Sequence, residues 1–227
     1  MGMEGALPTA PCHDRMKNIK SSSRTPLDRQ RIARTALALI DEKGINQLAM
    51  RSIGAALDVE AMALYHHFKN KAELLDGVKD FLLDELDERV GTGGTPLERI
   101  KSTFQQLRQM ALEHPDITPM LGASRFRTAR SMAFFEELIG QFYAAGLDAE
   151  QSARYYGLLS QYTLGCGLFA VDGYDQSATP ALDEDVAALF PRTDQVMPYA
   201  ALAHREANYQ FGIGLILTAM KAESQAA

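Results

Sequence analysis

Hydrogen-bond donors gather in one run of the chain, from Tyr65 to Lys71, with the sequence Tyr-His-His-Phe-Lys-Asn-Lys. A phenol, an imidazole and an ammonium group can each donate a hydrogen bond to a phosphate oxygen. A metal site at His66 and His67 is the alternative, but neighbouring side chains on a helix point about 100° apart. The run therefore suits contacts with a polyanion better than it suits a metal ion.

Other kinds of chemistry find little support in the sequence. His114 and Asp116 are the one pair that suggests acid–base catalysis, and Pro115 between them predicts a turn. The sequence holds no Ser/His/Asp arrangement, no glycine-rich phosphate loop and no cluster with metal-ligand spacing. Cys12 and Cys166 lie far apart, which argues against a disulfide framework and fits a reducing cytoplasm. We therefore expect neither an enzyme nor a protein with a metal or another cofactor.

Charge is distributed unevenly along the 227 residues. The net charge is −6, from 23 Lys and Arg against 29 Asp and Glu, which by itself argues against a nucleic-acid partner. Residues 1–76, however, hold 11 basic and 9 acidic side chains, whereas residues 77–227 hold 12 and 20. Between Arg15 and Thr35 there are seven basic residues and one acid, Asp28. The N-terminal part thus carries the charge that a polyanion attracts, although a solvated basic tail gives the same pattern.

Targeting and membrane segments are not evident. The start of the chain lacks the apolar core of a secretory signal, and no window approaches the ~18 uninterrupted apolar residues of a membrane helix. We expect a cytoplasmic protein with no membrane partner.

Helical spacing of apolar residues dominates the first part of the chain. A first helix is predicted between an N-cap at Asp28 and a C-cap at Gly44. Further helices are predicted at Leu48 to Leu57, Glu60 to Phe68 and Ala72 to about Val90, with a polar break at Asp58 and a turn at Lys69 to Lys71. Two short helices joined by a tight turn are the arrangement of a helix-turn-helix, whose second helix enters the major groove of DNA.

The rest of the chain is predicted to be a longer set of helices that follows a linker at residues 91–96. Thr95 is placed to cap a helix that starts at Pro96 and ends before Pro115. The following segments are predicted: an irregular piece from Ile117 to Arg127, a helix through Met132 to Tyr143, a helix from an N-cap at Asp148 to Leu168, a mobile loop from Asp172 to Pro198 with one helical turn at Val186 to Phe190, and a last helix from Tyr199 or later to about Lys221. No run has the period of a strand, so the predicted fold class is all-α.

A large set of residues within 26–86 resembles the N-terminal domain of the TetR family of transcriptional regulators. The residues that carry this resemblance are Arg31, Ile32, Ala36, Leu39, Gly44, Leu48, Arg51, Ile53, Ala56, Leu57, Val59, Leu64, Tyr65, His67, Phe68, Lys69, Asn70, Lys71, Leu74 and Leu75. The remainder resembles the ligand-binding body of the tetracycline-repressor branch at Tyr162 to Leu168 and at Phe211 to Leu217. The resemblance implies a three-helix helix-turn-helix domain at 26–86 and a ligand-binding and dimerisation domain at 87–227. We expect residues 1–25 before them to be a flexible basic tail.

The family resemblance also implies a ligand-responsive repressor that binds a palindromic operator as a homodimer and is released by a small-molecule effector. The DNA contacts that it implies are Arg51, Ala61, Met62, Ala63, Tyr65, His66, His67 and Lys71. Tyr65, His67 and Lys71 suit phosphates, whereas Arg51 and His66 are expected to read bases. The apolar trio 61–63 suits thymine methyl groups or simply a close approach. Arg15, Lys17 and Arg24 of the tail either reach the minor groove or have no such role.

On the effector side, two positions depart from the tetracycline-binding members. Met120 and Phe169 stand where those members hold a magnesium-chelated drug with a His and a Glu. A thioether and a phenyl ring are poor ligands for a hard cation, so tetracycline with magnesium is not expected. The predicted cavity suits an apolar or aromatic effector and is lined by Phe104, Leu107, Met110, Met120, Phe126, Phe135, Tyr162, Cys166 and Phe169. The few polar anchors are Gln105, Gln161 and Tyr162, and all of these residues are alternatively plain core.

The resemblance places the dimer surface on the helices around Leu159 and Leu215. Gly157, Gly165 and Gly167 on one helix and the pair at 212 and 214 on the other permit close helix contacts, either between subunits or within one. Two further functions stay open: a protein-interaction adaptor that kept the fold without DNA binding, and a small-molecule-processing enzyme on the same fold.

Overall fold

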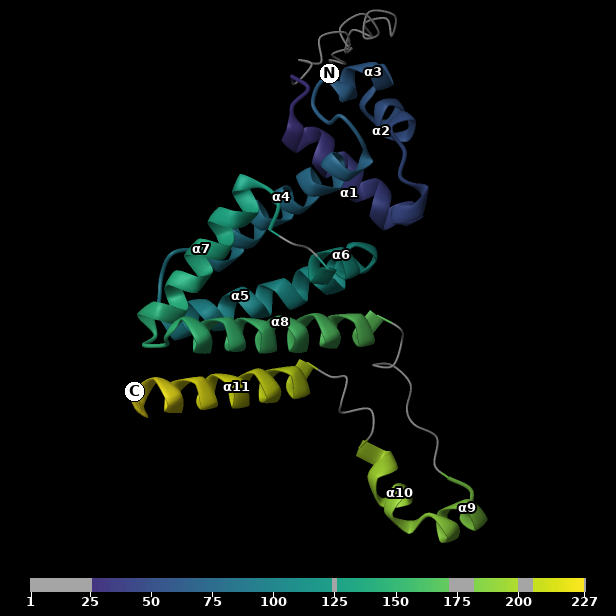
Figure 1. The fold of residues 1–227 in the computed structure, drawn as a ribbon. Helices are drawn as coiled ribbons and strands as arrows, with labels where there is room; N and C mark the ends of the chain where they lie inside the picture. The colour runs from purple at the N-terminus through teal and green to yellow at the C-terminus, as the bar shows by residue number, and fades with distance from the viewer. Residues whose placement is uncertain (1–25, 124–125, 172–181, 200–205, 227) are drawn as a thin grey trace, which may run out of the picture.

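The computed structural model describes residues 26–123, 126–171, 182–199 and 206–226 (Figure 1). Its α-helices are α1 (Arg29–Lys43), α2 (Met50–Leu57), α3 (Ala61–Tyr65), α4 (Lys71–Val90), α5 (Pro96–Glu113), α6 (Thr118–Ala123), α7 (Ala129–Ala144), α8 (Ala149–Val171), α9 (Glu184–Leu189), α10 (Pro191–Val196) and α11 (Glu206–Ala226). Short 3-10 helices lie at Ile45–Gln47 and Pro115–Ile117. Every regular element in these ranges is helical, which confirms the predicted all-α class. The tail at 1–25, with Cys12, lies outside the described residues.

Three predicted helix starts are confirmed by their caps. The side chain of Asp28 accepts a hydrogen bond from the backbone nitrogen of Arg31 (2.7 Å), and that of Asp148 accepts one from Gln151 (2.8 Å). Thr95 and Glu98 form a reciprocal capping box ahead of Pro96. At the other end of α1, Gly44 has φ +84°, a value that residues with a Cβ rarely adopt. Local chemistry thus sets where these helices begin and end.

The first core joins α1, α2 and α3 to α4 over most of its length, from Leu74 to Leu86. It contains the fully buried side chains of Ile32, Ile40, Ile53 and Leu64. The ring of Phe68, also fully buried, closes this core against Gly77 of α4. The body contributes too, because Met110 and Ile117 belong to the same cluster.

A second core holds the larger group of helices together. Phe104 of α5, Phe142 of α7, Leu159 of α8 and Ile213 of α11 are almost fully buried in it. Figure 1 shows α5 and α8 side by side across the body, with α11 along α8. Helix α4 runs from the N-terminal helices down to this group and contacts α5 and α7, while its own buried residues belong to the first core (Figure 1).

Two predictions about the body were wrong. The irregular piece expected from Ile117 to Arg127 contains α6, because the Thr118 hydroxyl donates to the carbonyls of Ala111 (3.1 Å) and His114 (3.2 Å) and anchors the turn where α6 begins. The loop expected from Asp172 to Pro198 contains α9, which covers most of the predicted turn, and also α10, which begins at Pro191. Residues 172–181 of that loop lie outside the described ranges.

Other boundaries differ by a few residues. The third helix ends at Tyr65 rather than Phe68. The last helix, whose start was predicted at Tyr199 or later, is described from Glu206 and continues to Ala226, past the predicted end at Lys221. Residues 200–205 before it lie outside the described part.

A direct polar contact joins the two parts of the molecule. Nδ1 of His114, at the end of α5, lies 2.9 Å from Oδ2 of Asp41 on α1. The sequence suggested Asp116 as the catalytic partner of His114, but the structure pairs this histidine with the other aspartate. His114 therefore serves as a contact between the body and the N-terminal helices.

Replacing Gly77 with alanine is expected to destabilise the fold. The added Cβ would lie 2.4 Å from Cε1 of Phe68, whose ring is fully buried. Overpacking of this kind costs about 1–3 kcal/mol, which exceeds the gain of roughly 0.5–1 kcal/mol that alanine brings to a helix interior. Urea unfolding of Gly77→Ala measures the loss.

The matched control is Gly140→Ala on α7, where a Cβ meets no atom within 4 Å. That variant should be as stable as the wild type or slightly more stable. Equal stability of the two alanine variants would contradict the packing of Phe68 on Gly77.

Candidate nucleic-acid interface and ligand cavity

The turn between α2 and α3 brings two helices into close contact. Asp58 ends α2 in the left-handed region, with φ +55°. The backbone nitrogen of Val59 donates to the carbonyl of Gly54 (2.9 Å), and a Cβ at Gly54 would lie 2.9 Å from the carbonyl oxygen of Val59. Helix α3 follows at Ala61, so three residues separate the two helices. This is the geometry of a helix-turn-helix.

The predicted DNA contacts lie at the end of the molecule that α2 and α3 form (Figure 1). Met62 is 69% exposed and Tyr65 is 44% exposed, whereas Leu64 between them is buried. The predicted contacts that are exposed are Arg51, Met62, Tyr65, His66 and Lys71, and those that are half-buried are Ala61, Ala63 and His67. The structure thus brings Arg51 of α2 to the same end as α3.

A network around Arg29 holds the segment that follows α3. The guanidinium of Arg29 lies 4.1 Å from the centre of the Phe68 ring, pairs with Glu73 (3.1 Å) and donates to the carbonyl of His67. The backbone nitrogen of Lys69 donates to the Glu73 carboxylate (2.9 Å), and this bond, together with Arg29, keeps the pKa of Glu73 below its usual value. In the sequence Arg29 is one of several basic residues near the N-terminus, and its spacing does not indicate that it holds the segment after α3.

Lys71 is also tethered within the protein. Its ammonium nitrogen donates to the carbonyl of Ile45 (2.9 Å), in the 3-10 helix after α1. An ammonium has three donors, so a phosphate contact remains compatible with this bond.

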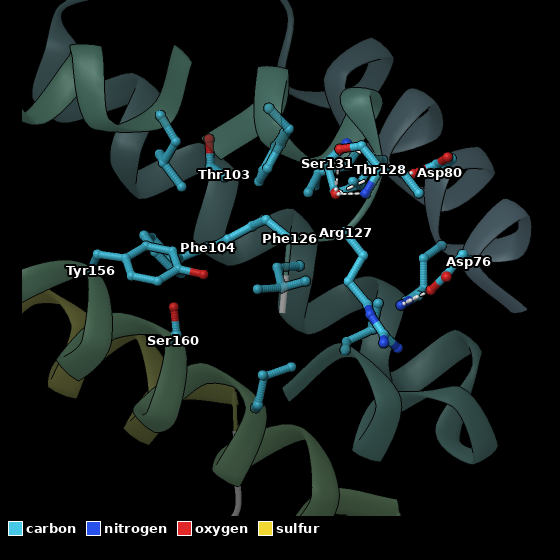
Figure 2. Close-up of a pocket in the computed structure, with 18 residues that line it drawn as sticks. Asp76, Asp80, Thr103, Phe104, Phe126, Arg127, Thr128, Ser131, Tyr156 and Ser160 are labelled. Atoms are coloured by element: carbon cyan, nitrogen blue, oxygen red, sulfur yellow. Dashed lines mark hydrogen bonds and ion pairs between the residues drawn. The ribbon is translucent and has the colours of Figure 1, made fainter. Parts of the chain in front are cut away.

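The body contains a cavity of about 130 Å³ between α4, α5, α7 and α8 (Figure 2). Most of its lining is apolar. The lining residues are Asp76, Lys79, Asp80, Leu83, Leu86, Thr103, Phe104, Leu107, Leu121, Phe126, Arg127, Thr128, Ser131, Phe134, Leu138, Tyr156, Ser160 and Leu164. Phe104, Leu107 and Phe126 of the predicted set are among them.

The other predicted ligand contacts lie elsewhere. Phe135 is not among the lining residues, and its ring stacks on that of Phe126 with centroids 4.2 Å apart. Met110 is buried in the N-terminal core and Met120 packs against that core. The side chain of Phe169 lies outside the described residues.

Tyr162 and Cys166 pack between α8 and α11 instead of lining the cavity. The Tyr162 hydroxyl donates to the carbonyl of Asn208 (3.1 Å), and burial raises its pKa to about 12. Gln105 donates to Gln210 of α11 (2.5 Å), so two of the three predicted anchors fasten α11 to the body. Gln161 is exposed and is not part of the lining.

Sequence reasoning missed the side of the cavity that α4 forms. Leu83 and Leu86 have the helical spacing of ordinary core residues, and nothing in the sequence distinguishes a leucine that faces a cavity from one that faces a neighbour. The charged residues Asp76, Lys79 and Asp80 come to the cavity on the same helix.

Polar groups gather at the α4 end of the cavity (Figure 2). Asp76 pairs with Lys79 (2.5 Å), whereas Asp80 accepts a hydrogen bond from the hydroxyl of Thr128 (2.6 Å). Within the described residues, no Lys, Arg or His nitrogen lies within 4 Å of the Asp80 carboxylate. Burial and the nearby Asp76 and Asp84 raise the pKa of Asp80, against the opposing effects of Thr128 and Arg130.

Arg130 of α7 clamps the next turns of α4. Its guanidinium pairs with Asp84 (2.6 Å) and Asp87 and donates to the carbonyl of Leu83 (2.9 Å). The start of α7, which forms one wall of the cavity, is therefore tied to the helix that begins in the N-terminal core.

Neither a membrane span nor a metal cluster is found in the described ranges. No helix there is long and apolar enough to cross a bilayer. No group of three His, Cys, Asp or Glu in those ranges is placed to hold a metal ion.

Two family models match the sequence. Residues 32–78 match bacterial regulatory proteins of the tetR family, and residues 92–223 match the tetracyclin repressor-like C-terminal domain. The first match covers the N-terminal helices through the first turns of α4. The second begins after α4 and runs from α5 into α11.

Individual relatives agree with these matches. An HTH-type transcriptional regulator of Saccharopolyspora erythraea is 25% identical over 146 residues, which are 64% of this chain and 62% of that protein. The class C tetracycline repressor protein of Escherichia coli is 42% identical over 57 residues, 25% of this chain and 26% of the repressor. The chain thus spans less than two thirds of the length of each. The crystal structure of apo ActR from Streptomyces coelicolor has a TM-score of 0.70 at 25% identity, covering 88% of this chain and 99% of that one.

Replacing Asp80 with asparagine is expected to raise the melting temperature at neutral pH, because the amide is uncharged and its oxygen still accepts from Thr128. The pKa of Asp80 is raised in the folded protein, so the folded state binds this proton more tightly than the unfolded chain does. The wild type therefore loses stability as the pH rises through the raised pKa. The two proteins should converge below the ordinary aspartate pKa of about 3.9.

Thermal melts of both proteins as a function of pH measure the difference, with Glu88→Gln on the exposed side of α4 as the control for loss of one negative charge. An advantage of Asp80→Asn that grows toward acid pH would contradict the expected sign.

Proposed function

The chain belongs to the tetR family of bacterial regulatory proteins, and from this we propose that it is a repressor that binds operator DNA as a homodimer and leaves it when an apolar or aromatic molecule fills the body cavity. The observation that carries the proposal is the course of α4. This helix packs into the helix-turn-helix core with Leu74 and Val78 and lines the cavity with Asp80, Leu83 and Leu86. A ligand in the cavity therefore acts directly on the helix that positions α2 and α3.

The proposed operator contacts follow from the exposed end of the molecule. Arg51 and His66 read base edges, and Tyr65, His67 and Lys71 hold phosphates. Ala61, Met62 and Ala63 let α3 approach the groove closely, with the exposed Met62 against thymine methyl groups. Because α3 has only five residues, the segment from His66 to Lys71 contributes as much to this surface as the helix itself.

The proposed dimer forms through the helices around Leu159 and Leu215. Leu159 is buried in its own subunit, but its neighbour Leu158 is 46% exposed, and Phe211 and Leu215 of α11 are 64% and 56% exposed. A face with this much exposed apolar surface favours association.

Some glycines of α8 and α11 lie against other residues of the same subunit, and others have open space beside them. A Cβ would meet Ala111 at Gly167 and the Tyr162 hydroxyl at Gly212, so these two glycines permit close contacts within the subunit. At Gly157, Gly165 and Gly214 a Cβ would meet nothing within 4 Å. These three positions are available for close approach of a second subunit.

Release requires that the ligand bind one of two arrangements of the dimer more tightly than the other. Bound to DNA, the two α3 helices must match half-sites about 34–36 Å apart. A ligand that fills the cavity and shifts α4 changes this separation. ActR of Streptomyces coelicolor, which shares the fold, has been solved in complex with actinorhodin, which supports ligand binding by this architecture.

The proposal places a helix-turn-helix domain at 26–86 and a ligand-binding and dimerisation domain at 87–227, in a cytoplasmic protein without catalytic activity. The cavity is assigned to binding, because no His or Cys is among the described residues that line it and the hydroxyl that Asp80 accepts from belongs to Thr128, which caps α7. Turnover of a bound molecule would contradict this part of the proposal.

DNA binding is tested with the fragment upstream of the gene, in fluorescence anisotropy as a function of salt. Lys71→Ala should weaken binding uniformly and lower the slope of log K against log salt by about one, because one phosphate contact is lost. Arg51→Ala should cost about 1–3 kcal/mol on the operator and relax sequence preference.

Lys101→Ala, which removes an exposed positive charge on α5, is the control and should bind as the wild type does. The proposal fails if the wild type shows no specific binding at moderate salt, or if all three variants behave alike.

Dimerisation is tested with Leu215→Glu, which puts a charge into the proposed interface. The variant should elute as a monomer in size-exclusion chromatography with light scattering, because an unpaired buried charge is costly. Met132→Glu changes an equally exposed residue on α7 and should remain a dimer. A monomeric wild type, or a dimeric Leu215→Glu, would contradict the proposed surface.

A further inference from the structure

Among the described charged residues that line the cavity, Asp80 is the one that is hydrogen-bonded to an uncharged side chain. Its carboxylate accepts from the Thr128 hydroxyl at 2.6 Å. Thr128 is itself held in place, because it caps α7 and forms a reciprocal pair with Ser131. Figure 2 shows Asp80, Thr128 and Ser131 together at one side of the cavity. The carboxylate is therefore half-buried and preorganised.

The positive charges of Lys79 and Arg130, which lie near Asp80, are paired with other carboxylates. Lys79 pairs with Asp76 at 2.5 Å, and Arg130 divides its guanidinium between Asp84 and Asp87. Asp76 and Asp84 stand one turn before and one turn after Asp80 on α4, and both add negative charge near it. A carboxylate that is partly removed from water without a countercharge is costly, and a cation brought to it regains that cost.

The rest of the cavity has a different character. Phe104, Leu107 and Leu138 of α5 and α7 and Leu164 of α8 form apolar walls. Tyr156 and Ser160 lie at the opposite side of the cavity from Asp76 and Asp80 (Figure 2). The cavity thus has one charged end and an uncharged, mostly apolar remainder.

We propose that the effector is an amphiphilic cation: an apolar or aromatic body that fills the space between α5, α7 and α8, with a protonated amine that binds the Asp80 carboxylate. This inference rests on the proposed function of the cavity and names the chemical class of its ligand. The amine donates to the carboxylate oxygens while the Thr128 hydroxyl keeps them in position. Charge-assisted bonds of this kind are stronger than neutral ones, particularly where water is partly excluded.

Arg127 is the group that favours the opposite sign. It also lines the cavity, has no ion pair within the described residues and is exposed, whereas Asp80 is half-buried. Solvent screens the exposed guanidinium more than the half-buried carboxylate, which is why Asp80 decides the sign of the ligand charge. An anionic ligand held by Arg127 is an outcome of the test.

The test compares three probes that share one body: 4-phenylbutylamine, 4-phenylbutan-1-ol and 4-phenylbutanoate. Calorimetry with the full-length protein at neutral pH should give an affinity for the amine at least about tenfold higher than for the alcohol, and the carboxylate should bind most weakly. In Asp80→Asn the advantage of the amine over the alcohol should disappear while binding of the alcohol persists. Glu88→Gln removes the same charge outside the cavity and should keep the wild-type order.

An amine that binds no better than the alcohol overturns the proposal, and so does an advantage that survives in Asp80→Asn. Tightest binding by the carboxylate, abolished in Arg127→Gln, would assign an anionic effector instead. Operator binding is measured on the same preparations without probes. Its absence would contradict the proposed function and leave the charge preference of the cavity standing, whereas a normal operator complex with no preference for the amine would overturn this inference alone.

Discussion

The long helix that links the N-terminal helices to the body constrains the whole molecule. Helix α4 has 20 residues, about 30 Å, and one end is packed around Phe68 while the other is clamped by Arg130. A helix transmits displacement because bending it disturbs its backbone hydrogen bonds. The fully buried Leu74 and Val78 leave no room for the N-terminal helices to slide along it. A displacement of α4 at Leu83 or Leu86 therefore reaches its contacts with α1 and with Phe68.

Polar interactions are used for positioning in both parts of the protein, but in opposite ways. Around Arg29, every charge has a partner: the guanidinium meets Glu73, and the Phe68 ring lies beneath it. This closed network fixes the backbone from His67 to Lys69, where the chain leaves α3. At the cavity, by contrast, Asp80 meets only a hydroxyl, and burial raises its pKa. A charge that is paired within the protein fixes the backbone around it. A carboxylate without a countercharge can instead bind a charged ligand.

The features that could be predicted from the sequence are those set by residues close together in the chain. Asp28, Thr95 and Asp148 cap helices as predicted, and the all-α class and the helix-turn-helix followed from periodicity and motif. The short helices α6 and α10 were not predicted, because each has six residues and offers less than two turns of periodic pattern. The cavity was only partly predictable. Phe104 and Phe126 line it, but Tyr162 packs against α11 and Met110 lies in the core of the N-terminal helices. Which face of an apolar helix borders a space depends on the crossing of all four helices, and that information is spread over the whole chain.

The boundary between the two cores does not follow the order of the helices along the chain. Met110 and Ile117 come from the body, yet they fill the hydrophobic core of the N-terminal helices, next to the contact between Asp41 and His114. A chimeric biosensor that joins these first helices to a foreign effector domain by cutting after α4 would leave a hole where these two side chains belong. The transplantable module is therefore discontinuous: it consists of α1 to α4 together with the end of α5 and the 3-10 turn that follows.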